Sequence, residues 1–265
     1  MRKLLLGVVM LSLLFLNCRS KQEEKSAQQL EVLNNTLTSM EIDGGWELLF
    51  DGKTFNGWRG LGRDDVQAEL WKSEEGAIRK LNSGEVPSLP DGRPVAGGDL
   101  MTKEAFDNFE LYFEWKITER GNTGLKYNVS EEMSQKYNSK YSALGFEYQL
   151  LDDKDTTYAG KLQPAQYTGS LYDLVAPTNA RLKPVGEYNS SKISINGNRI
   201  EHWLNGALLL TSEFGSPRLD SLFQRSKFKD IPHFLDKRKG HIVLQNHKDD
   251  AWFRNIKIRK ILQQE

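Results

Sequence analysis

The sequence lacks most of the features that mark disulfide, zinc, nucleotide or nucleic-acid chemistry. Cys18 is the single cysteine, so the chain can form neither an internal disulfide nor a cysteine-based zinc site. Lys plus Arg equals Asp plus Glu at 36 each, and no basic block stands out, so the charge pattern gives no support to a nucleic-acid partner. There is also no Gly-x-Ser-x-Gly motif, no Gly-rich phosphate loop and no internal repeat.

Long apolar runs are equally scarce, and the one present lies at residues 4–16. It follows Arg2 and Lys3 and is shorter than the roughly 20 residues that cross a bilayer, which is typical of an export signal. Cys18 follows the run and resembles the lipidated cysteine of bacterial lipoproteins. We therefore expect a signal peptide at 1–18 and a lipid anchor on Cys18 as the sole membrane contact. The expected location is the bacterial cell envelope, periplasmic or outer-surface, and plain secretion is the alternative.

The rest of the chain divides into a polar tether at 19–40 and one domain at 41–265. Within the domain, residues 109–117 (FELYFEWKI) are apolar at every odd position, which is the pattern of a strand with one face in a core. Residues 145–151 (GFEYQLL) alternate in the same way. Both segments therefore favour strands over helices.

Two Asn-Gly pairs, at 196–197 and 205–206, are typical of tight hairpins and predict a three-stranded meander over 192–210. The segments 241–245 and 252–261 also read as strands, residues 217–229 as a single helix, and 60–69 and 80–98 as loops. Many short strands joined by Gly, Asn and Asp turns predict an all-β fold of two packed antiparallel sheets.

Several sequence blocks resemble the 3-keto-disaccharide hydrolase domain family, in family order and over nearly the whole domain. The blocks are GWELLFDGKTFNGW at 45–58, GGDLMTKEAFDNFELYFEWKI at 97–117, GNTGLKY at 121–127, LGFEYQLLDD at 144–153, GSLYDLVAP at 169–177, KPVGEYN at 183–189, IEHWLNG at 200–206 and WFRNIKIR at 252–259. The resemblance implies a concanavalin A-like jelly-roll sandwich, in agreement with the strand pattern. It also implies a small carbohydrate substrate, a 3-keto-glycoside.

A ketone at sugar C3 acidifies the C2 proton, so a base can remove it and the C1 substituent can leave by elimination. Such chemistry needs a base, a cation or donor for the enolate oxygen, and an acid for the leaving oxygen. Glu147 and Gln149 share the polar face of the 145–151 strand, which suits a base beside a neutral hydrogen-bonding group. A solvated strand face is the simpler alternative.

The remaining candidates occupy other family-like blocks. His247 is expected to act as acid or base because its ordinary pKa is about 6.5, and Lys126 to stabilise the enolate. For substrate binding we name Asn122, Tyr172, Trp203 and Glu114, although Asn122 also suits a turn and Glu114 a cross-strand ion pair.

No cofactor is required by the sequence, although a divalent metal is possible at the adjacent carboxylates Asp152 and Asp153. Two residues depart from the family pattern Gln-Asp-His-Gly, because Asn246 and Lys248 flank the histidine here. The competing hypothesis is therefore a non-catalytic lipoprotein that binds carbohydrate on the same fold.

Overall fold

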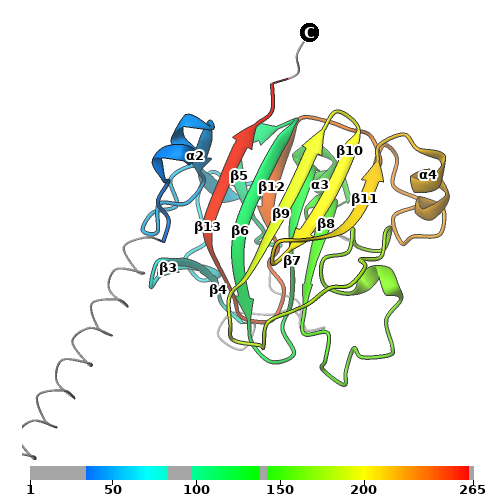
Figure 1. Ribbon diagram of the computed structural model, residues 1–265, viewed down its shortest axis with the longest axis horizontal. Helices are drawn as coiled ribbons and strands as arrows, with labels where there is room; N and C mark the ends of the chain where they lie inside the picture. The colour runs from blue at the N-terminus through cyan, green and yellow to red at the C-terminus, as the bar shows by residue number, and fades with distance from the viewer. Residues whose placement is uncertain (1–33, 83–96, 138–141, 263–265) are drawn as a thin grey trace, which may run out of the picture.

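The computed structural model describes residues 34–82, 97–137 and 142–262, and within them two antiparallel sheets pack face to face (Figure 1). The larger sheet runs β11-β10-β9-β6-β13-β4-β3, with β1 also paired to β13, and the smaller runs β2-β5-β12-β7-β8. The larger sheet comprises β1 (Trp46–Leu48), β3 (Trp71–Glu74), β4 (Ala77–Lys80), β6 (Phe109–Ile117), β9 (Asn189–Asn196), β10 (Arg199–Leu204), β11 (Ala207–Glu213) and β13 (Ala251–Lys260). The smaller comprises β2 (Trp58–Gly60), β5 (Leu100–Phe106), β7 (Asn122–Ser130), β8 (Leu144–Leu151) and β12 (Gly240–Leu244). The predicted two-sheet sandwich is confirmed.

The core lies between the two sheets and follows the period-2 pattern of the sequence. In β6 every odd position from 109 to 117 is buried. In β8, Phe146, Tyr148 and Leu150 face the same core, and the Tyr148 ring meets Phe113 edge to face with centroids 5.6 Å apart. The even positions of β6 and the odd positions of β8 therefore project from opposite outer faces of the sandwich.

The predicted meander is present as β9, β10 and β11, and Asn205 and Gly206 both have positive φ in its second turn. The two C-terminal strands do not pair with one another. Strand β12 lies between β5 and β7 in the smaller sheet, whereas β13 lies between β6 and β4 in the larger. The connection 245–250 therefore passes from one sheet to the other, and this crossing shapes the candidate site.

Helices are short in the part of the chain that the structure describes, and none is long and apolar enough to cross a membrane. They are α2 (Ser39–Asp43), α3 (Glu131–Tyr137), the 3₁₀ turn η1 (Pro164–Gln166) and α4 (Pro217–Phe223). The helix predicted at 217–229 thus ends at Phe223. The predicted loop at 80–98 lies largely outside the described residues.

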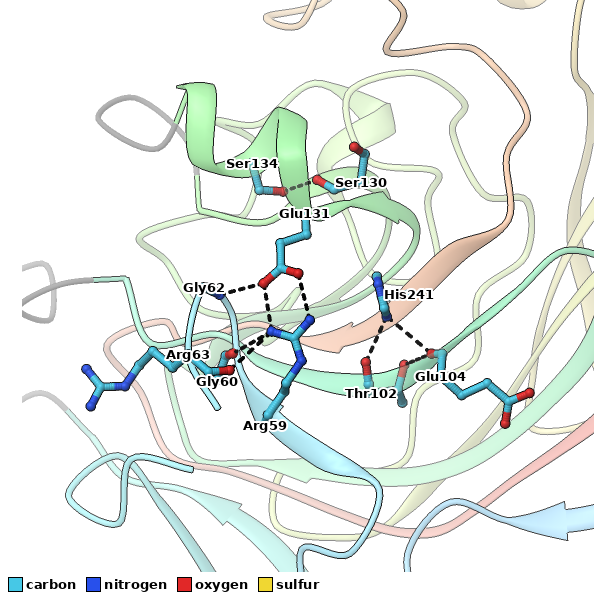
Figure 2. Close-up of polar contacts among 10 residues, drawn as sticks. All are labelled: Arg59, Gly60, Gly62, Arg63, Thr102, Glu104, Ser130, Glu131, Ser134 and His241. Atoms are coloured by element: carbon cyan, nitrogen blue, oxygen red, sulfur yellow. Dashed lines mark hydrogen bonds and ion pairs between the residues drawn. The ribbon is translucent and has the colours of Figure 1, made fainter. Parts of the chain in front are cut away.

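Helix α3 is fastened to β2 by a bidentate ion pair (Figure 2). The Arg59 guanidinium donates to both Glu131 carboxylate oxygens, at 2.7 and 2.6 Å. His241 lies beside this pair with its Nδ1 2.8 Å from the Thr102 carbonyl oxygen, which indicates a structural role. The pair fixes the margin of the smaller sheet's outer face.

The folded unit includes residues that the sequence assigns to the tether. Asn35 is buried, its backbone N–H donates to Asn255 Oδ1, and its side-chain oxygen accepts from the Asn255 backbone N–H. The side-chain amide nitrogen of Asn35 also donates to the Gly76 carbonyl. The predicted tether of 19–40 therefore overlaps the folded domain from residue 34 onward, because these long-range hydrogen bonds hold a segment that has little apolar content.

Candidate active site

Glu147 and Lys126 lie side by side on the outer face of the smaller sheet. They are register partners on β8 and β7, and Lys126 Nζ is 3.8 Å from Glu147 Oε2 and donates to the Ala143 carbonyl at 3.0 Å. Glu147 is only 6% exposed. Glu147 is therefore a buried carboxylate paired with a lysine, and this part of β8 is not a solvated strand face.

The segment after η1 covers the edge of β8 and places Tyr172 at this pair. The Tyr172 N–H donates to the Glu147 carbonyl at 2.9 Å, and Gly169 N–H donates to the Gln149 carbonyl. Lys227 Nζ lies 4.2 Å from the centroid of the Tyr172 ring. Tyr172, a candidate of the sequence analysis, therefore lies next to Glu147, together with Lys227, which the sequence analysis did not name.

The electrostatics of Glu147 combine burial with nearby charge. Burial raises its pKa, Lys126 and Lys227 lower it, and Asp99 raises it further, so that the net direction is upward. Burial also raises the pKa of Tyr172 to about 12, with a contribution from Glu147. The site therefore holds a carboxylate of increased basicity next to a neutral phenol.

Gln149 and Asn122 lie next to Glu147 on the same face. Gln149 is 2% exposed, and its Nε2 donates to Asn122 Oδ1 at 3.1 Å. Gln149 Oε1 is buried and has no hydrogen-bond partner in the part of the chain that the structure describes. This amide oxygen is thus available to a hydroxyl group of a ligand.

His247 also joins the group, but its protonation differs from the sequence-based expectation. Burial and the neighbouring lysines, among which Lys80 contributes most, lower the pKa of His247 to about 4. The imidazole is therefore neutral at pH 7, whereas the sequence-based expectation started from its ordinary pKa of about 6.5.

Besides Lys227, two further residues of this region were absent from the sequence-based prediction. Lys80 ends β4 on the core side, in register with Ala251, and is fully buried. Asp249 lies in the 245–250 connection and interacts electrostatically with Lys80. The sequence did contain a signal for Lys80. This lysine lies two positions after the core residue Ile78, where the alternating pattern predicts an apolar side chain.

Glu114 and Trp203, which the sequence analysis named for substrate binding, do not lie with Glu147 and Lys126. Both project from the outer face of the larger sheet, on the far side of the core. Glu114 accepts from Arg254 at 2.7 Å, and Trp203 donates to Glu201 at 3.1 Å. Period-2 alternation placed Glu114 on the polar face of its strand but left the direction of Trp203 open, and it could not tell which sheet each strand joins.

The adjacent aspartates are engaged as hydrogen-bond acceptors. Asp152 accepts from the Arg120 and Lys154 N–H groups, and Asp153 from the N–H and hydroxyl of Thr168. Within residues 34–82, 97–137 and 142–262 no group of three or more His, Cys, Asp or Glu side chains is arranged to hold a metal. The observed partners give both aspartates a structural role at the end of β8.

Comparison with known proteins agrees with the fold and the blocks above. A 3-keto-disaccharide hydrolase of Bacteroides thetaiotaomicron is 34% identical over 267 residues, covering 91% of this chain and 90% of the relative. A candidate glycosyl hydrolase of Parabacteroides distasonis superposes with a TM-score of 0.71 at 30% identity, covering 86% of this chain and 100% of its own. A second one from that organism has a TM-score of 0.61 at 22% identity, covering 82% of this chain and 99% of its own, and it shows the shared fold.

The family model described as the 3-keto-alpha-glucoside-1,2-lyase-like domain matches residues 45–259, which is most of the chain. The chain belongs to the 3-keto-alpha-glucoside-1,2-lyase-like domain family.

Proposed function

We propose that this protein, a glycoside-acting enzyme by its family and relatives, cleaves 3-keto-glycosides by removing the C2 proton and eliminating the C1 substituent. The buried Glu147–Lys126 pair is the observation that carries this proposal. A 3-keto-disaccharide hydrolase with 34% identity supports the substrate class.

The pair supplies two of the groups that elimination needs. Glu147 takes the proton from C2, and its raised pKa increases its strength as a base at neutral pH. Lys126, 3.8 Å away, stabilises the negative charge that passes to the C3 oxygen as the enolate forms. The pair separates this mechanism from ordinary glycoside hydrolysis, which uses two carboxylates across the glycosidic bond.

The surrounding groups orient the sugar. Gln149 Oε1 accepts from a sugar hydroxyl, while neutral His247 offers a hydrogen bond without a charge. Tyr172 remains protonated at neutral pH and can donate its hydroxyl hydrogen. These roles require a rigid frame, which the β7–β8 pairing provides.

The alternative of a non-catalytic carbohydrate-binding protein rested on Asn246 and Lys248. In the structure Asn246 is a framework residue, whose N–H donates to Asp99 at 2.7 Å and whose side chain donates to the Gly97 carbonyl at 2.6 Å. Lys248 is exposed. Both substitutions leave Glu147 and Lys126 in place, which supports the catalytic proposal.

The test is proton exchange at C2 together with cleavage. The protein should cleave a 3-keto-glucoside, leave the parent glucoside intact and catalyse C2 exchange with solvent deuterium. Glu147→Gln keeps size and shape but removes the base, so exchange and cleavage should both fall by about 10²–10⁴. Glu114→Gln, on the opposite face, is the matched control and should retain both activities. Equal cleavage of the unoxidised glucoside without exchange would contradict the mechanism.

We further propose that the enzyme acts at the bacterial cell envelope, tethered by lipid on Cys18. The support is the order of charged residues, short apolar run and cysteine in the sequence. Residues 1–33 lie outside the described part of the structure.

A further inference from the structure

A second group of polar atoms lies at the end of the sandwich, around the 245–250 connection. Lys80 Nζ, His247 Nδ1, Asp249 Oδ2 and Gln149 Oε1 are all buried, and none has a hydrogen-bond partner in the part of the chain that the structure describes. Buried polar groups in folded proteins are normally satisfied. Because the proposed function gives Gln149 Oε1 a sugar hydroxyl, the other three atoms call for a partner that the described protein groups do not provide.

These atoms belong to one cluster although they come from three elements. Lys80 is in register with Ala251, two residues after Asp249, and Lys80 interacts electrostatically with Asp249 and His247. Asp249 accepts a hydrogen bond from the Asn122 N–H, and the Asn122 side chain holds Gln149. The cluster is thus continuous with the strand that carries Glu147.

The composition of the cluster defines what it can bind. Apart from Gln149, it has one cationic donor, Lys80, and acceptors on Asp249 and His247. A ligand that donates and accepts at once fits this set, and buried water typically makes about three such hydrogen bonds. This inference rests on the proposed function: elimination leaves an unsaturated sugar, and hydration of that product to complete hydrolysis consumes one water.

We infer that Lys80 and Asp249 bind and activate the water molecule that adds to C1 after elimination. In the first half of the reaction Glu147 takes the C2 proton, the C1–O bond breaks, and the leaving oxygen takes the proton of the Asp249 carboxyl group. In the second half the water oxygen bonds to C1, a water proton returns to Asp249, and the proton on Glu147 returns to C2. The two halves sum to hydrolysis, and both carboxyl groups regain their starting states.

The environment of both residues agrees with these roles. Burial raises the pKa of Asp249 above its ordinary value, which favours the protonated form that the first half uses and strengthens the base of the second. Burial lowers the pKa of Lys80 to about 8, so that it is still mostly an ammonium at pH 7 and can donate to water or to the Asp249 carboxylate.

The experiment separates elimination from hydration with 4-nitrophenyl 3-keto-glucoside, whose leaving group departs without a proton donor. Nitrophenolate absorbance reports elimination, and mass spectrometry distinguishes 3-keto-glucose from the unsaturated ketone, which is lighter by one water. In Lys80→Met and Asp249→Asn, nitrophenolate release should stay within about threefold of wild type. Hydration should fall by about 10² or more, so that the unsaturated ketone accumulates.

Lys72→Met is the matched control, because this exposed lysine on β3 is not among the charges that act on Lys80, His247 or Asp249 and should leave the product ratio unchanged. Thermal unfolding checks the fold of each variant, and Asp249→Asn, which preserves shape, stands in if Lys80→Met unfolds. An unchanged product ratio, or an equal loss of both steps in a folded variant, overturns the inference while leaving the proposed function intact. Absence of nitrophenolate release by the wild-type protein overturns both.

Discussion

At the scale of single residues, the position of the Glu147 carboxylate depends on a neighbour that has no side chain. Gly124 lies on β7 two residues from Lys126, which is the register partner of Glu147. A Cβ at position 124 would lie 2.5 Å from Glu147 Oε1 and 2.8 Å from Glu147 Cγ. We predict that Gly124→Ala displaces this carboxylate and lowers kcat by about tenfold or more, because small displacements of a catalytic group are costly. Steady-state kinetics of the folded variant measure the loss.

The double variant distinguishes displacement of the base from general damage. In the Glu147→Gln background, Gly124→Ala should cause little further loss, because the group that it displaces is already inactive. Additive losses in the double variant would mean that Gly124 acts independently of Glu147.

The pH dependence of activity should also be set by the protonation of Glu147. A base must be deprotonated, so kcat/KM should rise as pH increases through the pKa of Glu147, which burial places above the ordinary value of 4.5. Lys126 lowers that pKa, so Lys126→Met should move the acid limb of the profile to still higher pH. A limb that stays in place in this variant would argue against Glu147 as the titrating base.

At the scale of elements, the 245–250 connection brings the two halves of the site together. It leaves β12 in the smaller sheet and enters β13 in the larger, so it passes the ends of β7 and β4. His247 and Asp249 consequently lie between Glu147 on one sheet and Lys80 on the other. A tight hairpin between β12 and β13 would have placed neither residue there.

The N-terminal segment that precedes α2 acts as a further element of the fold. Because the Asn35 side chain accepts from the buried Asn255 backbone N–H and donates to the Gly76 carbonyl, Asn35→Ala should lower the free energy of unfolding by about 1–3 kcal/mol. Denaturant unfolding measures the change. Met40→Ser, at a position that is 82% exposed, should have no such effect. Equal stabilities of the two variants would show that the segment contributes nothing.

At the scale of the whole molecule, the sandwich presents its two outer faces differently. The smaller sheet carries the buried polar site, whereas the larger carries ion pairs such as Arg254–Glu114. The described domain contains no membrane-spanning helix.

We predict that Cys18→Ala releases the protein from membranes without changing its kinetics, because the anchor and the site are separate. Fractionation of cells that express the full chain, followed by assay of each fraction, measures both effects. Several acyl chains are needed for stable anchoring, so loss of the cysteine should be decisive. If the variant still sediments with membranes, the lipid on Cys18 is not the anchor.

The local pattern of the sequence was sufficient to predict the strands and their core-facing side chains. Alternation in 109–117 and 145–151 defined which side chains face the core, and Asn-Gly pairs defined the meander, because both depend on neighbours within a few residues. Together with the family-like blocks, this alternation also identified Glu147, Gln149 and Lys126. Their shared face follows from strand geometry once β7 and β8 pair.

Only the tertiary structure decided which strands share a sheet. The choice of sheet in turn decides which side chains lie together in the candidate site. Glu114 and Glu147 have the same local pattern, yet β6 and β8 belong to different sheets, so that their carboxylates point in opposite directions. Lys80 joins the site because β4 ends beside the 245–250 connection, and His247 is neutral because burial and several lysines surround it. Pairing, burial and the charges of distant residues are properties of the folded chain, since each depends on contacts between segments far apart in sequence.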